Sequence, residues 1–220
     1  IGEPLAETPY IVRRGLAYKL DSITTDIDAG FLASGGIGEA SAALEAGQLR
    51  EIGRVAALGR RGAPIAGIGK VVCVGLNYRD HAEETGAALP AEPVLFLKDA
   101  STIVGPDDTV LIPRGSSKTD WEVELAVVIG ATARYLEDAE QALACIAGYT
   151  IAHDVSERDF QLERGGQWDK GKSCETFNTL GPWLIPATEV PDPQAIGLRR
   201  RVNGALRQNG DTKDMLFGVA

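Results

Sequence analysis

The stretch DWEVELAVVIG, at residues 120–130, carries the strongest fold signal in the chain. Glu122 and Glu124 lie two residues apart, and residues i and i+2 of a strand project from the same face. The residues around them are apolar and in part β-branched, which predicts a strand of a sheet buried on both faces.

Two carboxylates side by side in such a sheet repel each other and lose hydration, which costs several kcal/mol per ion. A divalent cation would relieve that cost, and hard oxygen ligands favour Mg²⁺, Mn²⁺ or Ca²⁺ over zinc. The alternative is that both glutamates line a solvated strand face, because the E-x-E pattern alone is common.

Composition narrows the class of protein. The chain has 220 residues, of which 44% are hydrophobic, enough for one sizeable core with a small appended unit. A net charge of −9 argues against a nucleic-acid partner, and no apolar run approaches the ~18 residues of a membrane span. Three widely spaced cysteines without a C-x-x-C pair predict reduced thiols in a cytoplasmic protein. Only two histidines are present, which argues against a histidine-based zinc site.

The N-terminal third differs from the rest. Residues 1–66 predict a small α+β accessory domain, with short strands at 9–21 and 26–34 and one helix at 40–53. The Gly- and Pro-rich stretch at 59–70 predicts a linker. Nothing in this third groups polar residues in a way that suggests chemistry.

Residues 67–220 predict the catalytic domain, mainly β with some α. Short apolar runs bounded by turn residues predict strands at 70–77, 94–99, 109–113, 149–154 and 182–186. A helix is expected at 136–146, and a hairpin at 198–212 with Asn203-Gly204 at its turn. The polar stretch at 154–178 predicts a long active-site loop with a helical turn at 156–162.

One motif in this loop is misleading. Residues 166–173, GQWDKGKS, fit the phosphate-loop pattern G-x-x-x-x-G-K-[ST]. A phosphate loop needs an apolar strand before it and a helix after it, and neither neighbouring stretch has that character. We expect the glycines instead to allow close packing of the loop and to direct Lys172 into a site.

Six blocks, taken in order, resemble the fumarylacetoacetate hydrolase family across residues 68–220. They are KVVCVGLNYRDHAEETG, PVLFLKDASTIVGP, DWEVELAVVIG, HDVSERDFQ, WDKGKSCETFNTLGPW and VNGALRQNGDTKDM. The resemblance is strongest to the branch that holds 2,4-diketo-3-deoxy sugar-acid hydrolases and proteins labelled ureidoglycolate lyase. It implies a mixed β-roll, a homodimer and a small anionic keto-acid substrate.

The resemblance also implies a metal site. It assigns Glu122, Glu124 and Asp154 as ligands of Mg²⁺ or Mn²⁺ and matches Lys172 to the family's active-site lysine. His153 is expected to point away from the metal, because adjacent strand residues project to opposite faces.

A second pair matches the acid/base residues of relatives that resemble acylpyruvate hydrolases: His81 and Glu84, one helical turn apart. Taken alone, a single histidine near a strand end is more often structural. Lys98 and Gln161 are further candidates for substrate contact. One departure is that the family's Thr-Gly-Thr-Pro block is missing, so we expect residues 67–220 to be truncated at their C-terminus.

Together these features predict a metal-dependent hydrolase that cleaves a carbon–carbon bond in a 2,4-diketo acid. Two alternatives stay open: a lyase, decarboxylase or isomerase on the same scaffold, and a non-catalytic or nucleotide-binding protein.

Overall fold

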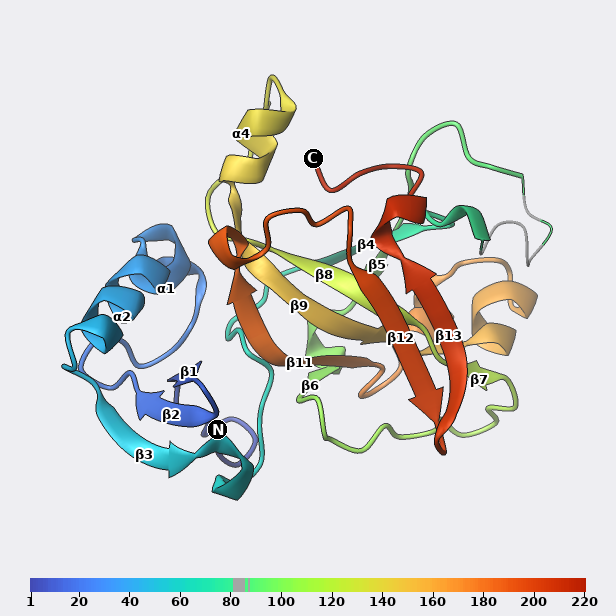
Figure 1. Ribbon diagram of the computed structural model, residues 1–220. Coiled ribbons are helices and arrows are strands. Elements are labelled where there is room, and N and C mark those ends of the chain that lie inside the picture. Colours follow the sequence, from blue (N-terminus) through green and yellow to red (C-terminus); the bar gives the residue numbers. More distant parts are fainter. Residues whose placement is uncertain (81–85, 87) are drawn as a thin grey trace.

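A computed structural model describes residues 1–80, 86 and 88–220 and shows a mainly β fold with some α, as the sequence predicts (Figure 1). The chain opens with an antiparallel sheet in the order β1 (Tyr10–Arg13), β2 (Leu16–Lys19) and β3 (Arg50–Arg54). Two helices, α1 (Ala29–Ala33) and α2 (Gly36–Glu45), connect β2 to β3.

Two predictions in this part need correction. The strand predicted at 26–34 is wrong, because Asp28 caps α1 by accepting a backbone hydrogen bond from the first turn at 2.9 Å. The helix predicted at 40–53 ends at Glu45, and Gly47 follows with a φ of 68°. The remaining residues form β3, which pairs with β2.

A four-stranded sheet forms the centre of the molecule. Its order is β6 (Ile103–Val104), β11 (Asn178–Pro186), β9 (Ile146–Asp154) and β8 (Val123–Ile129). β6 runs parallel to β11, and the other neighbours are antiparallel. Three strand pairs surround this sheet: β4 (Val71–Gly75) with β5 (Val94–Lys98), β7 (Thr119–Asp120) with β10 (Ser156–Glu157), and β12 (Gly197–Val202) with β13 (Ala205–Asp211).

The remaining elements are short. The helix predicted at 136–146 is present as α4 (Ala139–Ala144), and α5 (Asp169–Lys172) lies in the polar loop. The strand predicted at 109–113 is wrong, since Leu111 donates its N–H to the Thr176 hydroxyl at 2.7 Å instead of joining a strand. Single helical turns are η1 (Val55–Ala57), η2 (Ala100–Thr102), the π-helical η3 (Asp159–Glu163), η4 (Ala187–Glu189) and η5 (Thr212–Asp214).

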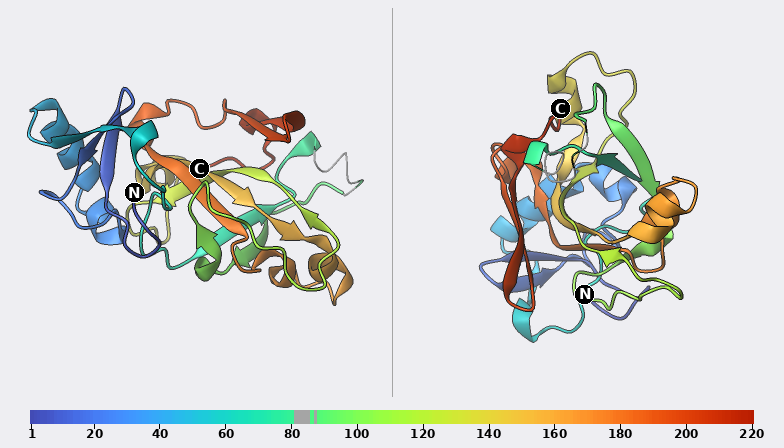
Figure 2. Two further views of the ribbon diagram at one scale, coloured as in Figure 1. Left: turned by 90° about the horizontal axis from the view of Figure 1, so that it is seen from below. Right: turned by 90° about the vertical axis from the view of Figure 1, so that its right-hand side faces the viewer.

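Different elements cover the two faces of the central sheet. Figure 2 shows the β12–β13 hairpin on one side of β8, β9 and β11, and the η3–α5 segment on the other. The turn of the hairpin is at Asn203 and Gly204, as predicted. The hairpin is joined to the sheet by Gln208, whose side-chain amide accepts from Val123 N at 2.8 Å and donates to Val123 O at 3.3 Å.

β8 is less deeply buried than its apolar sequence predicts. Val123 is buried, the residues that follow are half-buried, and Ile129 at the end of the strand is 54% exposed. β8 is the edge strand of the central sheet, so one of its sides has no neighbouring strand within residues 1–80, 86 and 88–220.

The main hydrophobic cluster lies where the N-terminal sheet and helices meet the central sheet. Its buried members are Leu20, Phe31, Leu32, Ala40, Leu49 and Ile65. Val128, Ala147 and Leu184 pack against it from β8, β9 and β11. Arg60 adds polar contacts, with salt bridges to Glu7 at 2.6 Å and Asp108 at 2.5 Å. The division predicted at residue 66 stays a prediction. No helix in the described part of the chain has the length and apolar character needed to cross a membrane.

Candidate active site

Two neighbouring strands bring the three candidate carboxylates together. Glu122 immediately precedes β8, Glu124 lies within it, and Asp154 ends β9. The strands are antiparallel, and Asp154 donates its backbone N–H to the Glu122 carbonyl at 3.0 Å. The register of β8 against β9 therefore sets the spacing of the carboxylates.

Two buried lysines neutralise Asp154. Lys172, only 2% exposed, donates from Nζ to Asp154 Oδ2 and to Glu122 Oε2, both at 2.6 Å. Lys98, only 3% exposed, donates to Asp154 Oδ1 at 2.6 Å and to the Val155 carbonyl at 3.0 Å. Burial lowers the pKa of Lys98. Burial also opposes the charge on Lys172, but Asp154 and Glu122 outweigh it and raise its pKa.

Arg158 is a member of the cluster that the sequence reasoning missed. Its Nη2 donates to Glu122 Oε1 at 2.5 Å and to Asp120 Oδ2 at 2.8 Å, and its Nη1 donates to the buried Gln161 Oε1 at 2.9 Å. Burial opposes ionisation of Glu122, but the charges of Lys172 and Arg158 prevail and lower its pKa to about 2. The sequence did contain one signal for this role: Arg158 lies four residues after Asp154, in the same family-like block HDVSERDFQ.

Glu124 is the exception in this cluster. Its carboxyl makes no hydrogen bond with any described residue, whereas Glu122 and Asp154 are each held by two cationic side chains. Burial and then the charges of Glu122 and Asp154 raise the pKa of Glu124 to about 8. An unpaired carboxyl of this kind is where an additional cation would be most favourable.

The donor chemistry fits a divalent cation. Within residues 1–80, 86 and 88–220, no three Asp, Glu, His or Cys side chains are arranged as a ready metal site, and the Lys172 ammonium stands between Glu122 and Asp154. The cluster nevertheless contains four carboxylates, with Asp120 as the fourth, against three cationic groups. The cluster therefore has fewer positive than negative groups, and Glu124 is the carboxyl whose ionisation this imbalance opposes.

Close packing of the polar loop sets the position of Lys172. A Cβ on Gly171 would lie 2.3 Å from the Glu157 carbonyl oxygen and 2.6 Å from Gln161 N, so only glycine lets α5 approach these backbones. The Lys172 ammonium also lies 4.9 Å from the ring centre of Phe96. The helix within the phosphate-loop lookalike has only four residues, Asp169–Lys172, and its Lys172 binds carboxylates, which argues against nucleotide binding.

His81 and Glu84 lie outside the described residues, so their assignment still rests on the resemblance. Asn77, four residues before His81, is held by hydrogen bonds to a distant part of the chain. Asn77 forms two side-chain hydrogen bonds with the Phe217 backbone, at 2.9 and 3.0 Å.

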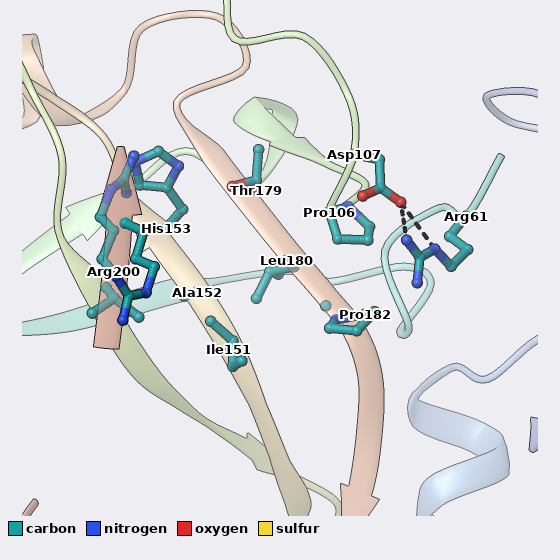
Figure 3. Close-up of a pocket in the computed structure, with 13 residues that line it drawn as sticks. Arg61, Pro106, Asp107, Ile151, Ala152, His153, Thr179, Leu180, Pro182 and Arg200 are labelled. Carbon is teal, nitrogen blue, oxygen red and sulfur yellow. Dashed lines mark hydrogen bonds and ion pairs between the residues drawn. The ribbon is translucent and has the colours of Figure 1, made fainter. Parts of the chain in front are cut away.

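His153 lies away from the carboxylates, as its place in β9 predicts. It lines a pocket on the other face of the sheet, where burial and then the charges of Arg200 and Lys98 lower its pKa to about 4 (Figure 3).

Comparison with known proteins identifies the family. The model of the fumarylacetoacetate hydrolase C-terminal family matches residues 70–220. A Burkholderia lata protein named "Putative hydrolase" is 54% identical over 161 residues, which are 73% of this chain and 57% of that protein. The chain thus spans 57% of the length of this relative.

Solved structures agree with the family model. A fumarylacetoacetate hydrolase from Exiguobacterium antarcticum has a TM-score of 0.79 and 35% identity, covering 96% of this chain and 73% of that one. A 5-carboxymethyl-2-hydroxymuconate delta-isomerase from Mycobacterium smegmatis has a TM-score of 0.71 and 32% identity, covering 97% and 73%. The chain belongs to the fumarylacetoacetate hydrolase family. This family includes both hydrolases and isomerases.

Proposed function

We propose that this chain forms the catalytic part of an enzyme that hydrolyses a carbon–carbon bond in a 2,4-diketo acid. The observation that carries the proposal is the buried Lys172 ammonium beside a carboxylate cluster in which Glu124 has no partner among the described residues. Such a cluster suits a substrate that gains negative charge during reaction, because a fixed cation is already in place to stabilise it.

Members of the family typically depend on a divalent metal. The carboxylates of Glu122, Glu124 and Asp154 would hold Mg²⁺ or Mn²⁺, which would supply Lewis-acid polarisation of a keto acid. With this charge added, the cluster becomes net positive and attracts an anionic substrate.

The side chains then have separate roles. His81, oriented by Glu84, takes a proton from water, and the resulting hydroxide adds to the C4 carbonyl. The C3–C4 bond breaks, C4 leaves as a carboxylic acid, and its bonding electrons pass into the C2–C3 enolate of a pyruvate unit. Lys172 stabilises the negative charge on the C2 oxygen, and a proton returned to C3 completes the reaction.

Two further cations keep the carboxylates in position. Lys98 holds Asp154 from the side opposite Lys172, and Arg158 holds Glu122 and Gln161. In this arrangement Lys98 has a positioning role, through its bonds to Asp154 and to the Val155 carbonyl.

The second candidate is an isomerase, lyase or decarboxylase on the same site, and it is favoured by the likeness to the Mycobacterium smegmatis isomerase. Two rates on His81→Ala distinguish the candidates. We expect C–C cleavage of an acylpyruvate to fall at least ~10²-fold, while exchange of C3 protons in a bound 2-keto acid continues. Unchanged cleavage would place water activation elsewhere and favour the second candidate.

We further propose a cytoplasmic homodimer. β4 and β5 leave Val72, Val74, Leu95 and Leu97 43–64% exposed, an apolar surface that contact with a second copy would bury. Sedimentation equilibrium tests the dimer, and Leu95→Asp should weaken it. A monomer at all concentrations would contradict this proposal.

A further inference from the structure

We propose that the pocket around His153 and Arg200 is a second ligand site, separate from the carboxylate cluster, which binds a small carboxylate with a compact apolar body. The inference does not depend on the proposed reaction.

The pocket lies on the opposite face of the central sheet from the Asp154 side chain. Val123, His153 and Thr179 are cross-strand neighbours on β8, β9 and β11, and all three line it. Arg200 of β12 closes one end (Figure 3). The cavity is about 360 Å³, within the range of small-molecule sites.

Two buried nitrogen atoms in this pocket have no partner. His153 Nε2 and Arg200 Nε are both inaccessible, and neither has a hydrogen-bond partner in the described part of the chain. Leaving such a group unsatisfied costs about 1–3 kcal/mol, so native structures rarely do so without a reason. Figure 3 shows the two side chains together at one end of the pocket. Because both atoms are closed to water, a carboxylate in the cavity would bond them once the His153 ring and the Arg200 guanidinium turn toward it.

Charge favours an anion at this end. Arg200 forms no salt bridge with a described carboxylate, and the charge of Asp120 acts on it only from beyond salt-bridge distance. Its guanidinium lies over the Trp121 ring at 5.6 Å from the centroid. At the far end, Arg61 is paired with Asp107 through its Nε at 2.9 Å, so that arginine is already neutralised. The available positive charge is therefore at the Arg200 end, in a chain with a net charge of −9.

The floor between the two ends is apolar. Ile151, which is 49% exposed, lies there with Leu180 and Pro182, and Figure 3 shows these side chains between Arg200 and the Arg61–Asp107 pair. Arg201 also lines the pocket, but its Nη1 donates to the Gly204 carbonyl in the turn of its own hairpin at 3.1 Å. Arg200 above an apolar floor suits a single carboxylate on a hydrocarbon body better than a polyphosphate, which would require several cations.

Calorimetric titration of the whole chain with benzoate tests the inference. We expect binding at millimolar concentrations that weakens about tenfold or more in Arg200→Gln. The matched control is Arg199→Gln, because Arg199 is an exposed neighbour on β12 that bonds Asn209, and it should leave binding unchanged. Ile151→Trp, which fills the floor, should also abolish binding and serves if Arg200→Gln does not fold.

Lys172→Met locates the ligand. Benzoate should bind this variant as it binds the original chain, because Lys172 is on the other face of the sheet. Circular dichroism under the titration conditions first checks that Lys172→Met is folded, because the loss of this lysine is expected to destabilise the chain. The inference fails if the original chain does not bind benzoate, if both Arg200→Gln and Ile151→Trp bind it normally, or if folded Lys172→Met does not bind it.

Discussion

Replacing Glu124 with glutamine should stabilise the metal-free protein, and the effect should depend on pH. The carboxyl of Glu124 titrates at about 8 in the folded chain and near 4.5 when exposed. A group whose pKa is raised by folding favours the folded state only while it is protonated. Its contribution is therefore present below about pH 4.5 and is lost as the pH rises to about 8.

The loss of folding free energy is set by the interval between the two pKa values of Glu124. Each pH unit between the two values is worth about 1.4 kcal/mol, which sets an upper limit of about 5 kcal/mol. Glu124 is only partly buried, so solvent screening reduces this limit, and we expect a loss of about 1–3 kcal/mol between pH 5 and pH 8. Glu124→Gln has no carboxyl to ionise and should not show this loss.

Urea denaturation after treatment with a chelator measures both proteins at the two pH values. Glu137→Gln is the control, since Glu137 is exposed and far along the chain from the cluster. Adding Mn²⁺ at pH 8 should stabilise the original chain and not Glu124→Gln. If the two proteins lose the same stability between pH 5 and pH 8, Glu124 is not the strained carboxyl and the metal assignment loses its physical basis.

Three further predictions follow from the same region. Lys172→Met should abolish turnover and destabilise the metal-free protein by about 3–5 kcal/mol, since it removes the cation shared by the buried Asp154 and the half-buried Glu122; denaturation with and without Mn²⁺ checks this. Gly171→Ala should cost more than about 2 kcal/mol because of its contact with the Glu157 backbone, whereas Gly38→Ala, with open space in α2, should be neutral or stabilising in thermal melting. Burial raises the pKa of the Cys73 thiol to about 12, so a thiol reagent at pH 8 should modify it at least tenfold more slowly than after unfolding, and equal rates would show that this thiol is accessible.

Much of the central sheet was predictable because its signals are local. The spacing of Glu122 and Glu124 predicts β8, and the apolar run at 149–154 predicts β9. The Asn203-Gly204 turn likewise predicts the hairpin that packs beside this sheet. The errors arose where a side chain changed the outcome. The stretch at 26–34 forms a helix because the Asp28 side chain accepts a hydrogen bond from the backbone of its first turn. The stretch at 109–113 forms no strand because the Leu111 N–H donates to the Thr176 hydroxyl and not to a neighbouring strand.

The site was predictable in its residue types but not in its pairing. Spacing placed the two glutamates together, the family resemblance added Asp154, and the pairing of β8 with β9 brings all three to one face of the sheet. That Lys172 bridges two carboxylates, while Glu124 has no partner, depends on how α5 packs against residues far from it in sequence. Arg158 was missed for the same reason, since its contacts with Asp120 form only after the loop folds back on the sheet.

The Gln208 amide has a consequence for the edge of the sheet. By accepting from Val123 N and donating to Val123 O, this one side chain imitates a piece of neighbouring strand at the residue between the two glutamates. Only an amide has both a donor and an acceptor in this fork. Hydrolysis of that amide to a carboxylate, a slow chemical change that ageing proteins undergo, would keep the accepted bond and turn the other into repulsion between two oxygens. It would also place a new negative charge beside a cluster already short of cations. Ageing at this single position would therefore loosen the hairpin and disturb the strand that carries both glutamates.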